Sequence, residues 1–160
     1  MTTICHMADA NPLVVSVLLA LLAAATAPER AEPGDLPDRR FQILVAKDGR
    51  CLRAGAGERG PRLVLGRCDP RDRRQLWRGG GGRLQNVGLA ERGASYLGMG
   101  RNDTVVWVSR SSPAGKGWRW DVHSGTLRLQ GRSLWITDGD RPRFAPPRRR
   151  GSRVELREVS

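Results

Sequence analysis

The stretch RCDPRDRRQLW, residues 67–77, carries one of the three cysteines of the chain and one of its five tryptophans. It follows an apolar segment, RLVLG, and ends in Gln75-Leu76-Trp77. The charged run between Cys68 and Gln75 interrupts the apolar pattern, as a connection between two strands does. If the same order of features recurs along the chain, the protein is built from repeats.

Two landmarks recur at the same spacing. The segments GRLQNVG (82–88) and GTLRLQG (125–131) lie 43 residues apart, and so do Trp77 and Trp120. On this alignment Tyr96 and Ser111 stand where the first repeat has its two cysteines, and a third, looser repeat has Val154 where a third tryptophan is expected. The spacing therefore predicts three repeats of about 40 residues.

The apolar segments themselves predict strands. Eleven short segments follow one another from Phe41 onward, separated by Gly, Pro, Asp and Arg. No window shows a period of 3.6 residues, so we expect an all-β domain with almost no helix. Repeats of about four short strands cannot bury their apolar faces singly, so three of them should pack around a common axis and close a barrel.

The N-terminal region differs in composition from the rest. Residues 13–25, LVVSVLLALLAAA, form an apolar run that ends in small residues and is too short to cross a bilayer as a helix. We interpret residues 1–27 as a helical signal peptide, although Asp9 and the lack of Lys or Arg before the run also suit a buried or membrane-anchoring segment. Residues 28–40 then form a flexible lead-in, and residues 41–160 form the domain.

Two further features suit secretion, or exposure on the extracellular face of the plasma membrane. Removal of residues 1–27 takes Cys5 away and leaves Cys51 and Cys68, which we expect to form a disulfide in an oxidising compartment. Two buried free thiols are the alternative. Asn102 begins the sequon NDT and is predicted to be glycosylated.

These motifs resemble a known family. Cys-Leu, an apolar strand ending in Cys-Asp, and Gln-x-Trp, repeated three times, resemble the ricin B-type β-trefoil lectin domain. FQILVAKDGRCLRA, RCD, RLQNVG, YLGMG and WRW, taken in order over residues 41 to about 157, are most similar to the N-terminal cysteine-rich domain of the mannose receptor family. The resemblance implies a β-trefoil with Gln75, Trp77 and Trp120 in its core. It also implies a non-enzymatic, carbohydrate-binding head of an endocytic receptor.

The sugar sites that the resemblance implies are altered. Arg53 and Gly98 stand where galactose-binding repeats carry an aspartate, so we expect no galactose recognition in the first two repeats. In the third repeat, Asp140 replaces an asparagine of the family's sulfated-sugar site and would repel sulfate. The candidate ligand-binding residues are Trp135, Thr137, Asp140, Arg141 and Arg143. Arg141, Arg143 and the run 148–150 offer bidentate contacts to an anion, with a solvated loop as the alternative.

Composition limits the remaining functions. The net charge of +12 attracts anionic partners. We therefore expect glycans, sulfated or other anionic glycoconjugates, or glycoprotein ligands as partners, and no nucleic acid. His123 is the only histidine after the leader, and no nucleophile motif or metal-ligand spacing occurs, so we expect no enzyme, cofactor or metal. The alternatives are a secreted basic β-trefoil that binds heparan sulfate, and a structural trefoil without a ligand.

Overall fold

A computed structural model describes residues 34–160 of the chain, and the predicted signal peptide lies outside them. The described part is all-β, with twelve strands and four 3-10 helices of three residues each. The strands are β1 (Arg40–Val45), β2 (Cys51–Gly55), β3 (Arg62–Gly66), β4 (Trp77–Gly80), β5 (Arg83–Asn86), β6 (Tyr96–Met99), β7 (Val105–Val108), β8 (Trp118–Asp121), β9 (Thr126–Leu129), β10 (Arg132–Ile136), β11 (Pro142–Phe144) and β12 (Val154–Glu158). The 3-10 helices are η1 (Arg73–Gln75), η2 (Val87–Leu89), η3 (Arg101–Asp103) and η4 (Pro113–Gly115). None of the helices between residues 34 and 160 has the length and apolar composition needed to span a membrane.

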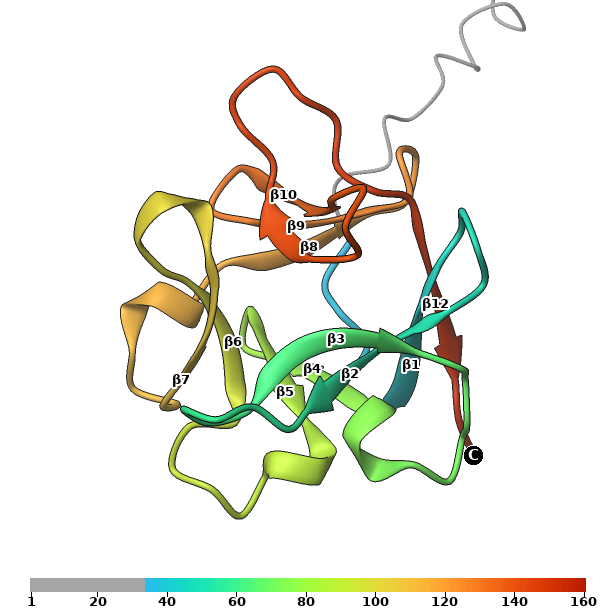
Figure 1. The fold of residues 1–160 in the computed structure, drawn as a ribbon, viewed down its shortest axis with the longest axis vertical. Helices are drawn as coiled ribbons and strands as arrows, with labels where there is room; N and C mark the ends of the chain where they lie inside the picture. The colour runs from blue at the N-terminus through green and yellow to red at the C-terminus, as the bar shows by residue number, and fades with distance from the viewer. Residues whose placement is uncertain (1–33) are drawn as a thin grey trace, which may run out of the picture. The chain divides into compact units, whose positions relative to one another are not determined.

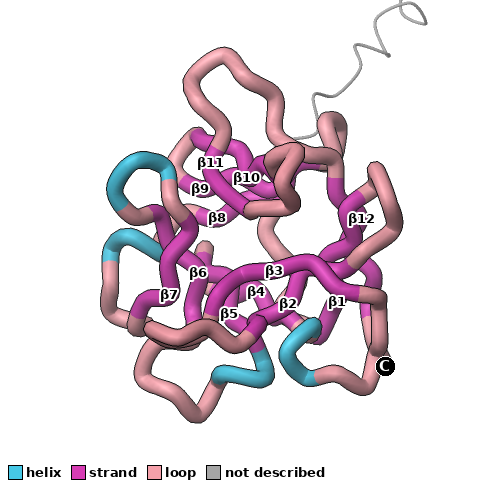
Figure 2. Tube along the Cα trace, viewed as in Figure 1, coloured by secondary structure: helices cyan, strands magenta, loops and turns pink. Residues whose placement is uncertain are grey.

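The strands divide into three units of four, which confirms the predicted β-trefoil (Figure 1). The first and last strands of the units belong to the barrel, where β1 pairs with both β12 and β4, β4 pairs with β5, and β8 pairs with β9. Backbone hydrogen bonds from Trp118 N to Gly82 O and from Val154 N to Gly125 O join the units to one another. The middle strands form the hairpins β2–β3, β6–β7 and β10–β11, which surround one end of the barrel (Figure 2).

The core repeats with the units. Phe41, Leu84 and Leu127 lie on the first barrel strand of each unit, and all three are fully buried. The second strands supply a buried set of Leu52, Leu97 and Leu134, and the last strands supply Trp77, Trp118 and Val154. Because each set comes once from every unit, the apolar side chains meet on the common axis and no unit can bury its face alone.

Trp118, and not Trp120 as predicted, is the counterpart of Trp77. The Nε1 of Trp77 donates to Leu52 O at 3.1 Å, and the Nε1 of Trp118 donates to Leu97 O at 2.8 Å. Trp120 instead pairs with Leu127, as Gly79 pairs with Leu84, and it is only half-buried at the edge of the core.

A difference in turn length explains the error. The β4–β5 hairpin turns through Gly81 and Gly82, both with positive φ, whereas the β8–β9 hairpin turns through the four residues 122–125. Trp77 and Trp118, which precede the turns, are 41 residues apart, whereas Leu84 and Leu127, which follow them, are 43 residues apart because of the two extra residues. Trp120 lies two positions after Trp118 and therefore matched the spacing of 43 by coincidence. Side chains two residues apart point to the same side of a strand, so strand alternation does not separate the two candidates.

Two other boundaries differ from the sequence prediction. The folded region begins before Phe41, since Leu36 is buried in the core and Pro37 O accepts from Gly79 N at 2.7 Å. Leu36 fills the space that Gly79 leaves, where any Cβ on that glycine would lie 2.4 Å from Leu36 Cβ. The twelfth strand, β11, was missed because it has only three residues and begins with a proline, which is typical of loops.

Candidate functional site

The five ligand-binding residues predicted in the third repeat all lie on the β10–β11 hairpin, where Trp135 pairs with Arg143. Trp135 is half-buried, and the guanidinium of Arg149 lies 4.0 Å from the centre of its ring. Arg143 donates to Asn102 O at 2.8 Å, on the neighbouring unit. Thr137 and Arg141 close a tight loop, in which Thr137 N donates to Arg141 O at 3.1 Å. These local contacts engage several of the side chains, and Arg149 covers one face of the Trp135 ring.

Asp140 is part of an ion-pair network between units. Its carboxylate accepts two hydrogen bonds from Arg50, at 2.6 and 2.9 Å, while Arg50 also contacts Asp48. Hydrogen bonding to Arg50 lowers the pKa of Asp140 and of Asp48 below the ordinary value, and the same contacts raise the pKa of Arg50. Arg50 therefore offsets part of the negative charge that was predicted to repel sulfate, while it is shared with Asp48.

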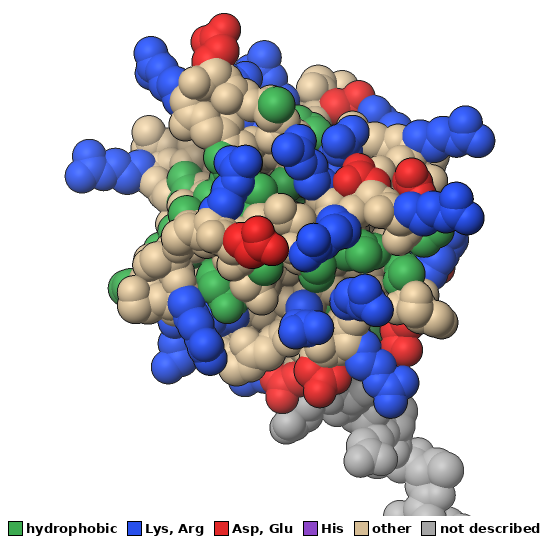
Figure 3. Space-filling model, turned by 90° about the horizontal axis from the view of Figure 1, so that it is seen from below, with side chains coloured by type: hydrophobic (Ala, Val, Ile, Leu, Met, Phe, Trp, Pro, Cys, Tyr) green, Lys and Arg blue, Asp and Glu red, His purple; other side chains and the backbone are tan. Residues whose placement is uncertain are grey.

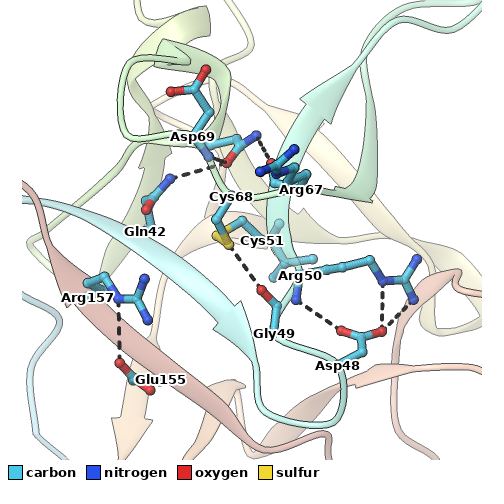
Figure 4. Close-up of a disulfide and its surroundings, with 12 residues drawn as sticks. Gln42, Asp48, Gly49, Arg50, Cys51, Arg67, Cys68, Asp69, Glu155 and Arg157 are labelled. Atoms are coloured by element: carbon cyan, nitrogen blue, oxygen red, sulfur yellow. Dashed lines mark hydrogen bonds and ion pairs between the residues drawn. A yellow bond between two sulfur atoms is a disulfide. The ribbon is translucent and has the colours of Figure 1, made fainter.

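The predicted disulfide is confirmed in the first repeat. Cys51 and Cys68 are bonded across 17 residues of sequence, beside a hydrogen-bonded group that ties the end of β3 to η1 (Figure 4). Gln42 Nε2 donates to Gln75 Oε1 at 3.2 Å, and Gln75 Nε2 donates to Arg67 O at 2.8 Å. Both glutamines are buried, and together they tie β1 to the η1 loop.

The other two repeats have no disulfide at this place. Tyr96 and Ser133 stand where Cys51 stands, each directly before a core leucine, and neither can form the bridge. In the second repeat a cavity of about 350 Å³ lies against Tyr96 and the β4–β5 turn. In the third repeat a cavity of about 720 Å³ lies between the β8–β9 turn, Ser133 and the loop 148–153. We call this larger cavity the β8–β9 groove.

Guanidinium groups dominate the β8–β9 groove. Its cationic lining consists of Arg128, Arg148, Arg149, Arg150 and Arg153. Hydroxyl groups of Ser124, Thr126 and Ser133 lie between them. This combination of fixed cations and hydroxyl groups suits an oxygen-rich anion, because arginine binds carboxylate, sulfate or phosphate with two parallel hydrogen bonds.

One carboxylate, Asp121, also lines the groove. Its Oδ1 accepts from the backbone N–H groups of His123 and Ser124, both at 3.1 Å. These contacts, with that of Ser124 the largest, lower the pKa of Asp121, and Arg128 lies 4.0 Å from its other oxygen. The remaining four arginines make no ion pair among residues 34–160. Arg128 Nε is buried without a hydrogen-bond partner, and another nitrogen of the same guanidinium donates to Gly131 O at 3.1 Å.

Arg53, which stands where galactose-binding repeats carry an aspartate, makes a salt bridge in the first repeat. Arg53 lies 3.5 Å from Asp72 and lines a separate cavity of about 530 Å³ with Asp69 and Gln75. In the second repeat, Gly98 is buried, and a Cβ there would lie 2.9 Å from Ala114 O. Neither position offers the carboxylate that would accept two sugar hydroxyls.

Sequence reasoning found the run 148–150 but missed the rest of the groove. Arg128, Ser133 and Arg153 are distant from one another in sequence, and the fold brings them together. An alignment of the three repeats contains a signal for Arg128. Gln42, Gln85 and Arg128 occupy equivalent positions, because each directly follows the buried core residue on the first strand of its unit. A position that is glutamine in two repeats and arginine in the third marks the repeat with different chemistry.

Comparison with known proteins supports the fold. No protein-family model and no curated protein matches the chain. Among solved structures, the β-trefoil lectin of the Vibrio vulnificus hemolysin/cytolysin, with N-acetyl-D-lactosamine bound, is similar with a TM-score of 0.61 at 16% identity over 76% of this chain and 96% of that one. The mdaA-1 domain has a TM-score of 0.59 at 16% identity, covering 79% of this chain and 94% of that domain. GalNAc-T7 with UDP, GalNAc and Mn²⁺ has a TM-score of 0.57 at 14% identity over 76% of this chain and 22% of that protein. These similarities confirm the β-trefoil fold of the chain.

Proposed function

We propose that this protein is a non-catalytic glycan-recognition module that binds anionic or sulfated glycoconjugates in the β8–β9 groove. The observation that carries the proposal is the arginine-rich lining of this groove, in the one repeat where Arg128 stands at the position of Gln42 and Gln85. Four of its arginines have no carboxylate partner in the described part of the chain, and Ser124, Thr126 and Ser133 supply hydroxyl groups beside them. An anionic sugar offers both the charge and the hydroxyl groups that such a lining binds.

The sequence resemblance extends the proposal to the setting of the domain. We place it outside the cell, secreted or on the extracellular face of the plasma membrane, as the head of an endocytic receptor of the mannose receptor type. The disulfide suits an oxidising compartment, and the β-trefoil lectin of Vibrio vulnificus, which binds N-acetyl-D-lactosamine in its structure, is a precedent for sugar recognition on this fold. No group of three or more metal-binding side chains occurs in residues 34–160. The proposed recognition uses arginine and hydroxyl groups and does not involve a metal ion.

A glycan array tests this proposal. Protein secreted without residues 1–27 should bind sulfated or carboxylated glycans more tightly than their neutral parents. The double variant Arg148→Ser/Arg150→Ser removes two exposed groove arginines and should weaken that binding by at least about tenfold, since each charge-assisted contact contributes on the order of 1.5–3 kcal/mol. Arg59→Ser/Arg71→Ser makes the same charge change on exposed residues outside the groove and should leave the affinity nearly unchanged. Equal losses in both variants would refute the site.

The net charge of +12 favours a second candidate, a secreted basic β-trefoil that binds heparan sulfate through its whole surface. Basic side chains are spread over the face in Figure 3 and do not gather in one patch. Such binding would disappear at moderate salt and would not depend on the position of the sulfate. A binding series in rising salt, with isomeric monosulfated sugars, distinguishes this candidate from a shaped site. The absence of all glycan binding would support a structural trefoil.

A further inference from the structure

Another cavity lies where the three hairpins meet. It has a volume of about 540 Å³ and shares no residue with the β8–β9 groove. Its apolar lining consists of Leu63, Val64, Val105, Trp107 and Pro142. These residues come from β3, β7 and β11, and β7 contacts each of the other two strands (Figure 2). We call this site the hairpin cavity.

The floor of the hairpin cavity is apolar and held in place by the core. Trp107 stacks on the buried Trp77, with ring centres 6.0 Å apart and planes at 7°. Leu63 and Val105 also pack on the core while each remains half-buried. The three side chains therefore present fixed apolar surface that is only partly removed from water, and a partner that covers it gains about 25 cal/mol for each Å².

The strands around the hairpin cavity have free edges. Within residues 34–160, β3 and β7 end the path of the larger sheet, and β11 ends the smaller one. Apart from one bridge between Thr104 and Arg143, the outer edges of these strands pair with no other strand of that region. Unpaired backbone donors and acceptors beside an apolar floor suit an extended peptide, which can add main-chain hydrogen bonds to the burial of a side chain.

The charge at the rim selects the partner. Arg62 and Arg141 line the cavity and are exposed, and neither makes an ion pair among the described residues. The one carboxylate at the rim, Asp140, already accepts both hydrogen bonds from Arg50. A second copy of this chain would bring like charges together on a protein of net charge +12, so an acidic partner is the complementary one.

We propose that the hairpin cavity docks an extended acidic segment of a partner protein, which inserts one aromatic or branched aliphatic side chain against Trp107. The carboxylates of the segment pair with Arg62 and Arg141, and its backbone lies along the edge of β3 or β7. The site is independent of the β8–β9 groove, so glycan binding and peptide binding can occur together.

A random peptide library displayed on phage tests the proposal without assuming a sequence. Selection on the secreted protein should enrich segments in which one bulky apolar residue lies between acidic residues. A synthetic peptide from the enriched set should change the tryptophan fluorescence emission of the wild-type protein. The Trp107→Phe variant should not show this change. The double variant Arg62→Glu/Arg141→Glu should bind the peptide at least tenfold more weakly than the wild type. The double variant Arg148→Ser/Arg150→Ser, which tests the glycan groove, should bind the peptide as tightly as the wild type.

Three outcomes would overturn the proposal. Enriched peptides without acidic residues would contradict the role of the rim, and equal binding to Arg62→Glu/Arg141→Glu would place the peptide elsewhere. Sedimentation that shows dimers dissociating on peptide addition would make a second copy the occupant. Circular dichroism and thermal unfolding of each variant separate a lost contact from a lost fold. Failure of glycan binding in the array leaves each of these outcomes unchanged, so the two proposals fail separately.

Discussion

Trp77 and Trp118 make the same contact one unit apart, each donating its indole N–H to the backbone carbonyl of a buried leucine. The acceptors, Leu52 O and Leu97 O, belong to the first hairpin strand of the same unit. Each tryptophan thus ties the last strand of its unit to the hairpin and fills the shared core. In the third unit Val154 fills the position without the hydrogen bond.

This equivalence predicts the stability of three variants. Trp77→Phe and Trp118→Phe each leave a cavity and an unpaired buried carbonyl, so each should lower the free energy of unfolding by roughly 2 kcal/mol or more. Trp120→Phe should cost less than about 1 kcal/mol, because Trp120 is half-buried and its Nε1 has no partner to lose. Chemical denaturation followed by circular dichroism measures all three. A loss at Trp120 equal to that at Trp118 would contradict the assignment.

The disulfide should contribute stability in the first unit alone. Cys51 and Cys68 close a loop of 17 residues, so Cys51→Ser/Cys68→Ser should lower the free energy of unfolding by about 3 kcal/mol. The glutamine pair beside it stays in place, so the variant should still fold. Wild-type protein unfolded in the presence of a reducing agent should give the same midpoint as the double variant. Equal midpoints for oxidised wild type and variant would show that the buried glutamines hold the loop unaided.

The glycosylation sequon predicts one modification. Asn102 is exposed in η3, with its side chain on the surface between β6 and β7. Secretion from a eukaryotic cell line should give protein heavier by one N-linked glycan, and Asn102→Gln should remove the difference. Thr104→Ala should have the same effect, since the hydroxyl belongs to the acceptor sequon. Mass spectrometry before and after peptide N-glycosidase treatment measures it, and identical masses for wild type and variants would exclude use of the site.

Local signals in the chain were enough to predict the architecture. Strand-like segments, turn glycines such as Gly82 and Gly125, and the Gln-x-Trp at Trp77 together indicated three β units. These features depend on backbone conformation and strand period, which a few adjacent residues determine. The disulfide followed from the same reasoning, because only two cysteines remained once the leader was excluded.

The errors arose where distant contacts, or a local change in turn length, decide the structure. Leu36 belongs to the core because Gly79 leaves room for it, and no periodicity in the segment before Phe41 signals this. The longer β8–β9 turn shifted the tryptophan alignment by two residues. The β8–β9 groove likewise depends on Arg128 and Ser133 meeting the loop 148–153, which strand pairing decides and composition does not.

The network of Arg50, Asp48 and Asp140 predicts how stability depends on acid. Hydrogen bonding to Arg50 lowers the pKa of both carboxyl groups in the folded state, so each adds stability above the unfolded value of about 3.9. This contribution is lost as the pH falls through the lowered values. The Tm of the wild type should therefore fall steeply below about pH 4. Asp140→Asn should have a lower Tm at pH 7, and its Tm should decrease less steeply in acid (a shallower acid limb).

Thermal unfolding between pH 2 and pH 7 measures this effect, and the two curves should converge at the acid end. Asp138→Asn is the matched control, since Asp138 is exposed on the same loop and makes no ion pair within the described residues. Because Asp140 and Arg50 are solvent-exposed, added salt should reduce the difference at pH 7 by screening the pair. Parallel acid limbs for wild type and Asp140→Asn would show that the pair does not link the units in solution.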